Sequence, residues 1–151
     1  MAKSYRLTPA TRLINWLSAS LIKAGVAASY AHILTVRGRT TGRLLSTPVD
    51  VITAGQDRWL VGAYGPSNWT RNARAAGEVT LRRGRRSQRY TVSEPDPRDA
   101  VPVLREYITR IRVARPYFDA TPDSPDDAIM AELATHPVFR LTPKPAALRL
   151  L

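Results

Sequence analysis

Two short polar segments carry residue types suited to binding an anionic ligand. The first, RGRTTGR at residues 37–43, places arginines, glycines and threonines in one predicted turn between two apolar runs. Backbone amides beside glycine can point at an anion, and arginine side chains can bind it with two hydrogen bonds. The segment lacks the glycine spacing and the Lys-Ser/Thr pair of a phosphate-binding P-loop. Spacing alone supports an anion-binding turn and a solvent-exposed basic hairpin equally.

The second segment, AYGPSNWTRNAR at residues 63–74, is a polar and aromatic cluster at a predicted junction between a strand and a helix. A helix N-terminus attracts anions through its free N–H groups and its dipole, and Arg71 adds a positive charge there. Taken singly, Trp69 is interpreted as a core anchor, and Asn68 could merely cap the helix. The cluster as a whole indicates a ligand site.

Two later segments are open to two interpretations each. RRGRRSQR at residues 82–89 holds five arginines, which could bind nucleic acid or acidic lipid. The exposed face of a hairpin with charged edges is the favoured interpretation. In ARPYFDATPD at residues 114–123, Tyr117 and Phe118 could cover a planar ligand or fill the core.

Composition narrows the chemistry further. A net charge of +11 over 151 residues favours anionic partners. The chain has no cysteine, and its two histidines lack a ligand-like spacing, so we expect neither thiolate chemistry nor a metal site. No nucleophile elbow is present, so an enzyme of this sequence would depend on a cofactor. Without a membrane-spanning apolar run or a recognisable leader, a cytoplasmic protein is expected.

The N-terminal part predicts an amphipathic helix that starts with Thr8 as N-cap and Pro9 in its first turn and stops near Gly25. Its apolar stripe recurs at helical spacing. We favour the interpretation that this stripe packs on the protein core. The alternative is that the helix contacts a membrane, with Trp16 at the interface. The stripe comprises Leu13, Ile14, Leu17, Leu21 and Ile22.

The remaining chain predicts strands joined by short turns, which implies antiparallel pairing. A short helix within residues 65–77 should end at Gly77, and a helix over residues 94–113 should start near Asp99 to tolerate Pro102, with Asp96 or Asp99 as its cap. A last short helix is expected over residues 125–136. Strands are expected at residues 32–36, 47–53, 57–64, 78–83, 85–92 and 137–143.

These elements predict an α+β fold, a small closed or split antiparallel β-barrel of about six strands with flanking helices. We expect one domain over residues 1–151. Within it, residues 1–30 form the N-terminal helix, residues 31–93 the barrel core with a cofactor groove, and residues 94–151 the later helices and the last strand.

The two segments, in this order and separation, resemble the deazaflavin-dependent nitroreductase family of actinobacteria, small FMN-binding-like split-barrel oxidoreductases. The resemblance is strong over residues 33–92 and looser to Phe139, and its carriers are LTVRGRTTGRLLSTPVDVI and RWLVGAYGPSNWTRNARAAGEVTLRRGRR. It implies coenzyme F420 as the hydride carrier, whose phosphate and oligoglutamate tail would suit the positive charge of the chain. The chain departs from the family at three positions. Many relatives carry a lysine or arginine where this chain has Thr40, and several carry an arginine in place of Leu45 and an aromatic residue in place of Asp50. These differences leave FMN or a haem-type ligand as alternative ligands.

By this resemblance, Tyr117 closes over the cofactor ring. Our hypothesis for catalysis is that Tyr64 or Tyr117 hydrogen-bonds the acceptor or donates a proton to it. The implied cofactor-binding residues are Arg39, Thr40, Thr41, Arg43, Leu45, Ser46, Thr47, Pro48, Val49, Asp50, Gly62, Ala63, Tyr64, Gly65, Asn68, Trp69, Thr70, Arg71 and Asn72.

The function expected from sequence is therefore an F420-dependent reductase that transfers a hydride to a quinone, a nitroaromatic or an activated alkene. The alternatives are a non-catalytic split-barrel protein that binds F420, FMN, haem or lipid, and, third, a basic nucleic-acid-binding domain. A homodimer is expected, because split barrels often pair and build their site at the interface. Nucleic acid is not the expected partner, and the N-terminal helix could contact a membrane.

Overall fold

Six antiparallel strands close into a barrel in the order β1-β2-β3-β6-β5-β4. The computed structural model describes residues 2, 9–23 and 29–145 of the chain. The strands are β1 (Ala31–Arg37), β2 (Leu44–Ala54), β3 (Asp57–Val61), β4 (Glu78–Arg83), β5 (Arg86–Ser93) and β6 (Val138–Pro143). The helices are α1 (Pro9–Lys23), α2 (Asn68–Ala76), α3 (Pro97–Arg110) and α4 (Asp126–Ala131), with 3₁₀ turns η1 (Arg112–Tyr117) and η2 (Glu132–Ala134). The expected barrel of about six strands is confirmed.

An apolar core fills the barrel. Because side chains alternate along a strand, every second residue of each strand points inward. On β1 these are Leu34 and Val36, which are buried together with Leu60 and Phe139 from β3 and β6. Ala73 of α2 belongs to the same cluster and Trp69 packs against it, so α2 covers one side of this core.

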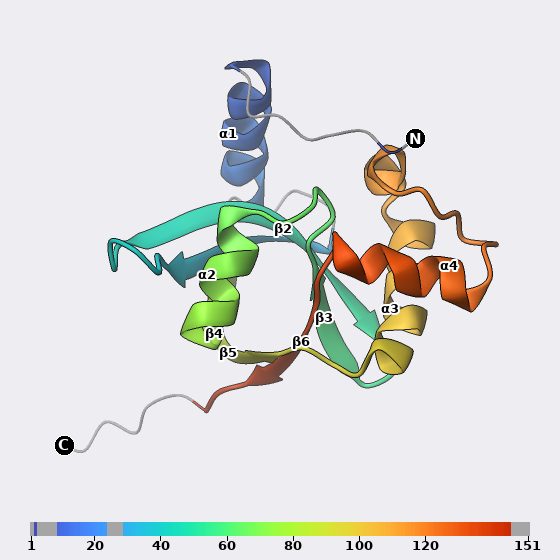
Figure 1. Ribbon diagram of the computed structural model, residues 1–151. Helices are drawn as coiled ribbons and strands as arrows, with labels where there is room; N and C mark the ends of the chain where they lie inside the picture. The colour runs from blue at the N-terminus through green and yellow to red at the C-terminus, as the bar shows by residue number, and fades with distance from the viewer. Residues whose placement is uncertain (1, 3–8, 24–28, 146–151) are drawn as a thin grey trace.

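A second core lies outside the barrel. Residues of the opposite strand faces, such as Ile52 on β2 and Trp59 on β3, pack against α3, η1 and α4. Leu104 and Ile108 of α3 are fully buried there. Figure 1 shows α3 and α4 together on one side of the barrel, away from α1. Apolar packing therefore covers both faces of the end of β2 and of β3, whereas the first residues of β2 are exposed.

The expectation that the apolar stripe of α1 packs on the core is wrong for most of its length. Ile22 is buried, but Leu13, Ile14, Leu17 and Leu21 are each about half exposed, between 48% and 60%. Trp16 is 65% exposed. Figure 1 shows α1 projecting from the barrel beside β2, apart from α3 and α4. The predicted cap Thr8 and stop Gly25 lie outside the described residues.

Helix α3 starts earlier than expected. It begins at Pro97, and the Asp96 side chain caps it by accepting a hydrogen bond from the Arg98 amide. Pro102 therefore sits inside the helix, and the expected start near Asp99 is wrong. Because proline has no N–H, the Arg98 carbonyl lacks its usual helical hydrogen bond. Pro102 and Arg98 are both exposed, so water can hydrogen-bond this carbonyl.

Candidate functional site

A cavity of about 740 Å³ lies between the first half of β2 and the N-terminus of α2. These are the two polar segments that the sequence singled out. Its lining residues are Asn15, Val36, Leu45, Ser46, Thr47, Pro48, Tyr64, Pro66, Ser67, Asn68, Trp69, Arg71 and Asn72. Most of the predicted cofactor-binding residues of β2 and α2 are thus brought to one groove.

A second cavity of about 360 Å³ shares four lining residues with the first: Asn15, Pro48, Tyr64 and Trp69. It adds the predicted residues Val49, Asp50 and Ala63 together with Tyr30 and Tyr107. The groove and this second cavity are therefore neighbours along β2.

The N-terminus of α2 is built as a capping box. The Ser67 side chain accepts a hydrogen bond from the Thr70 amide, and the Thr70 hydroxyl accepts one from the Ser67 amide. Ser67 is therefore the cap, and the suggestion that Asn68 caps this helix is wrong. Helix α2 ends at Gly77, as expected, in a left-handed conformation with φ of 73°. The capped end faces the groove, where the helix dipole favours a negative charge.

Arg71 supplies a positive charge at this end of the groove. Its side chain is exposed, and within the described chain it makes no ion pair with a carboxylate. Arg74, one turn further along α2, is instead paired with Glu94 at 2.5 Å. The donor set at the α2 N-terminus thus suits an anionic group, while Leu45, Pro48 and Trp69 offer apolar surface beside it.

The turn between β1 and β2 is attached to α2 through one amide. Asn72 Oδ1 accepts hydrogen bonds from the Arg39 amide at 3.1 Å and from Arg39 Nη1 at 2.7 Å. Asn72 is only 2% exposed. The turn is closed by the Gly38 amide, which donates to the Arg43 carbonyl, and by Gly42 with φ of 73°. The Arg39 side chain therefore joins the two walls of the groove.

Several predicted site residues do not line either cavity. Arg39, Thr40, Thr41 and Arg43 lie in the exposed turn beside the groove. Thr70 is buried under the α2 cap, and Gly65 follows the strand in a left-handed conformation with φ of 91°.

Gly62 has a packing role. A Cβ atom there would lie 2.9 Å from Pro137 Cδ and 3.0 Å from Thr70 Cγ2, closer than real side chains approach. The Gly62 carbonyl accepts a hydrogen bond from the buried His136 Nδ1. Gly62 thus fixes the segment that carries Tyr64 against α2.

The two aromatic residues of the later loop have separate places. Phe118 is buried and stacks on His136, with ring centroids 4.0 Å apart. Tyr117 is half-buried, and its ring meets the Tyr64 ring edge-on at 4.7 Å. Phe118 therefore fills the core, whereas Tyr117 contacts a residue that lines both cavities.

A half-buried carboxyl, that of Asp50, lies at the inner end of the site. Burial raises the pKa of Asp50 from 3.8 to about 6, and a hydrogen bond from the Tyr107 hydroxyl opposes this rise. Burial and the Asp50 charge raise the pKa of Tyr107 well above its usual value. A carboxyl whose pKa lies near neutrality can hold and release a proton under physiological conditions.

Sequence reasoning missed Tyr107, Tyr30 and Asn15 as site residues. Tyr107 follows the apolar stripe of α3 and carries no signal of its own in the sequence. Asn15 lines both cavities because α1 lies beside β2, a placement that local pattern does not encode. Among the described residues, no three histidine, cysteine or acidic side chains are arranged to hold a metal ion. No helix within the described ranges is long and apolar enough to span a membrane.

Comparison with known families gives a match over most of the chain. The model of a family described as F420H(2)-dependent quinone reductase matches residues 22–121, which include β1, β2, the α2 segment and Tyr117. No curated protein sequence matches the chain.

Three solved structures illustrate the similarity of fold. An F420-H2 dependent reductase is 15% identical, with 76% of this chain and 95% of that chain covered and a TM-score of 0.51. An FAD-binding protein from Mesorhizobium loti is 12% identical, with 85% and 89% covered and a TM-score of 0.50. A structure described as a domain-swapped dimer is 14% identical, with 89% and 100% covered and a TM-score of 0.52. At these identities the likeness concerns the fold alone.

The Asp50 carboxyl should make stability depend on pH. The pKa of Asp50 is about 6 in the folded protein and 3.8 when unperturbed, so the folded state binds the proton more tightly. Protonation of Asp50 therefore stabilises the fold at low pH, and this stabilisation is lost as the pH rises from about 4 to about 6. Asp50→Asn should remove the dependence. Between pH 4 and pH 7, its free energy of unfolding should rise relative to wild type by on the order of 2 kcal/mol, measured by urea denaturation.

The matched control is Asp123→Asn, which changes an exposed aspartate. Its pH profile of stability should run parallel to that of the wild type. A parallel profile for Asp50→Asn as well would contradict the burial of an Asp50 carboxyl with a raised pKa.

Proposed function

The chain belongs to the F420H(2)-dependent quinone reductase family, and we propose that it uses reduced coenzyme F420 to reduce a small electrophile. The acceptors we propose are quinones, nitroaromatics and activated alkenes. The observation that carries the proposal is the single groove into which β2 and the α2 N-terminus bring the predicted cofactor residues. All residues that line this groove, apart from Asn15, lie within the matched residues 22–121.

The donor set of the groove fits an anionic, planar cofactor. Arg71 and the N-terminus of α2 would hold the phosphate and the acidic tail, because they concentrate positive charge at one end. Arg39 and Arg43 in the neighbouring turn extend this charge. Leu45 and Pro48 would support the ring, with Trp69 on the opposite wall. FMN remains the alternative cofactor, since its phosphate and ring would use the same groups.

When bound, reduced F420 supplies a hydride to the acceptor. The protein has to align the acceptor with the cofactor and limit the access of water. We assign Tyr64 and Tyr117 to the acceptor side, since their rings meet edge-on beside the second cavity. Asp50, with its pKa of about 6, could supply the proton that reduction consumes.

A homodimer is part of the proposal. The exposed apolar face of α1 is unusual for a helix of a monomer, and a second copy of the chain would cover it.

Light scattering should give twice the monomer mass. Leu13→Ser combined with Leu17→Ser should shift it to monomer, whereas Leu44→Ser, at an exposed leucine on β2, should not. A monomeric wild type that sediments with anionic vesicles would instead support membrane contact through α1.

Arg71 and Arg74 offer a matched pair for testing the cofactor groove. Both are exposed arginines of α2, but Arg71 lines the groove and Arg74 is paired with Glu94. In an anaerobic assay that follows oxidation of reduced F420 by menadione, Arg71→Gln should raise the KM for F420 by about tenfold, the loss of one charge-assisted contact. Arg74→Gln should leave it within about twofold, since it removes an equal charge away from the groove.

The same assay examines the two tyrosines. A proton-donating role predicts that Tyr64→Phe or Tyr117→Phe lowers kcat without changing the KM for F420. Unchanged turnover for either variant would remove that residue from the role. Absence of F420 oxidation by the wild type with every acceptor class would contradict the proposed reductase and support a binding protein.

A further inference from the structure

A third cavity, lined mainly by basic residues, lies at the end of the barrel remote from the turn at residues 38–43. Its volume is about 950 Å³, and its lining includes His32, Arg58, Arg83, Arg86 and Tyr90. His32 is near the start of β1 and Arg37 at its end, so the length of the strand, about 17 Å for five residues, separates this cavity from the turn. The apolar core of the barrel lies between the two regions.

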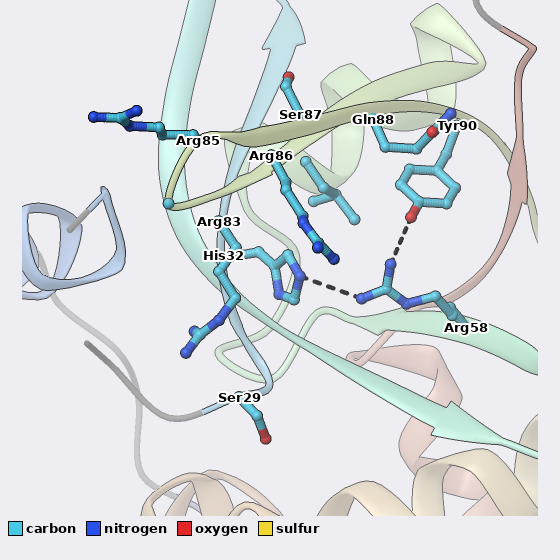
Figure 2. Close-up of a pocket in the computed structure, with 11 residues that line it drawn as sticks. Ser29, His32, Arg58, Arg83, Arg85, Arg86, Ser87, Gln88 and Tyr90 are labelled. Atoms are coloured by element: carbon cyan, nitrogen blue, oxygen red, sulfur yellow. Dashed lines mark hydrogen bonds between the residues drawn. The ribbon is translucent and has the colours of Figure 1, made fainter. Parts of the chain in front are cut away.

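The floor of this cavity is a chain of hydrogen bonds centred on Arg58. Arg58 Nη2 donates to His32 Nε2 at 3.2 Å, and Arg58 Nη1 donates to the Tyr90 hydroxyl at 2.5 Å (Figure 2). Since a guanidinium only donates, His32 Nε2 accepts, and Nδ1 carries the proton that it donates to the Tyr30 carbonyl at 2.9 Å. Burial, with the charges of Arg58 and Arg83, lowers the pKa of His32, which agrees with a neutral ring.

Arg58 thus carries a positive charge between two neutral partners. Within the described chain no carboxylate forms an ion pair with Arg58 or Arg86. Two of the five N–H groups of Arg58 are used, which leaves three for a ligand. The Tyr90 hydroxyl, on a side chain only 3% exposed, accepts from Arg58 and retains its own proton to donate.

A second arginine converges on the same place. Figure 2 shows the Arg86 side chain reaching from β5 toward Arg58 and His32, while Arg85 points away from them. Arg83 Nη1 is bound to the Ala31 carbonyl at 2.9 Å and adds its charge at the rim. Like charges that line one cavity repel each other, and an anion bound between them would replace this repulsion by attraction.

We propose that this cavity is a second anion-binding site, independent of the cofactor groove, for a small organic molecule that bears a phosphate group. Donors from β3, β5 and the end of β4 approach from several directions, which suits the tetrahedral oxygens of a phosphate better than a planar carboxylate. The volume exceeds that of phosphate alone. Leu81, Ser87 and Gln88 would line the space for the organic part.

The probe for this site is pyrophosphate, and the readout is the imidazole NMR signal of His32. The chain has only two histidines, so the buried His136 is an internal reference. Pyrophosphate should shift the His32 signals saturably, with a dissociation constant below about 1 mM, and leave those of His136 in place. A response that does not saturate, or that moves both histidines equally, would overturn the proposal.

Matched arginine variants separate a built site from diffuse attraction. Arg86→Gln and Arg58→Gln should each weaken binding by about tenfold or more, as expected for a lost charge-assisted hydrogen bond. Arg82→Gln removes the same charge from an exposed residue of β4 that does not line the cavity, and should change binding by less than about twofold. Arg86 is exposed, so its variant keeps the test valid if Arg58→Gln fails to fold.

Equal weakening in all three variants would overturn the proposal. The proposal would also be overturned if a short DNA duplex bound more tightly than pyrophosphate and all three variants weakened DNA binding equally. The arginines would then form a nucleic-acid-binding surface. Glycerol 3-phosphate, measured beside vesicles of phosphatidic acid, identifies the source of the phosphate. A His32 response to the soluble compound supports the proposal, and a response confined to vesicles contradicts it.

Discussion

The geometry of the candidate site depends on one buried amide. Asn72 Oδ1 accepts from both the main chain and the side chain of Arg39, and so connects the β1–β2 turn to α2. Because β2 begins directly after that turn, the same contact sets the distance between Leu45 and Arg71 across the groove. The anion-binding end of the groove and its apolar walls are thus positioned by a neutral side chain.

Barrel closure explains how two basic regions coexist in a small chain. Residues of β1 and β4 pair through registers such as Leu34 with Leu81, and the apolar interior fills the middle of the barrel. The polar ends of the same strands must then find partners outside that core. At one end they meet α2, whose capped N-terminus attracts anions. At the other end Arg58 donates to the neutral groups His32 and Tyr90 and, within the described residues, pairs with no carboxylate, which leaves part of the +11 charge available for ligands.

Local pattern predicted the strands and turns because their causes are local. Alternating apolar residues and the glycines at 77 and 84 predict elements that the structure contains. The exposure of Leu13 and Leu17 was not predictable, since a helical apolar stripe does not reveal which element covers it. Likewise, Tyr107 hydrogen-bonds Asp50, and Arg58 hydrogen-bonds His32. In both pairs the partner is remote in sequence, so local pattern could not predict the contact. The resemblance located the groove, whereas hydrogen-bond partners required the structure.

The central claim is that the groove between β2 and α2 binds F420. The most direct test is titration of the purified protein with F420 and, separately, with FMN, each followed by fluorescence quenching. The account predicts saturable binding of F420 at micromolar concentrations or below, roughly 8 kcal/mol of binding free energy, and weaker binding of FMN. Binding of FMN at micromolar levels without binding of F420 would contradict it.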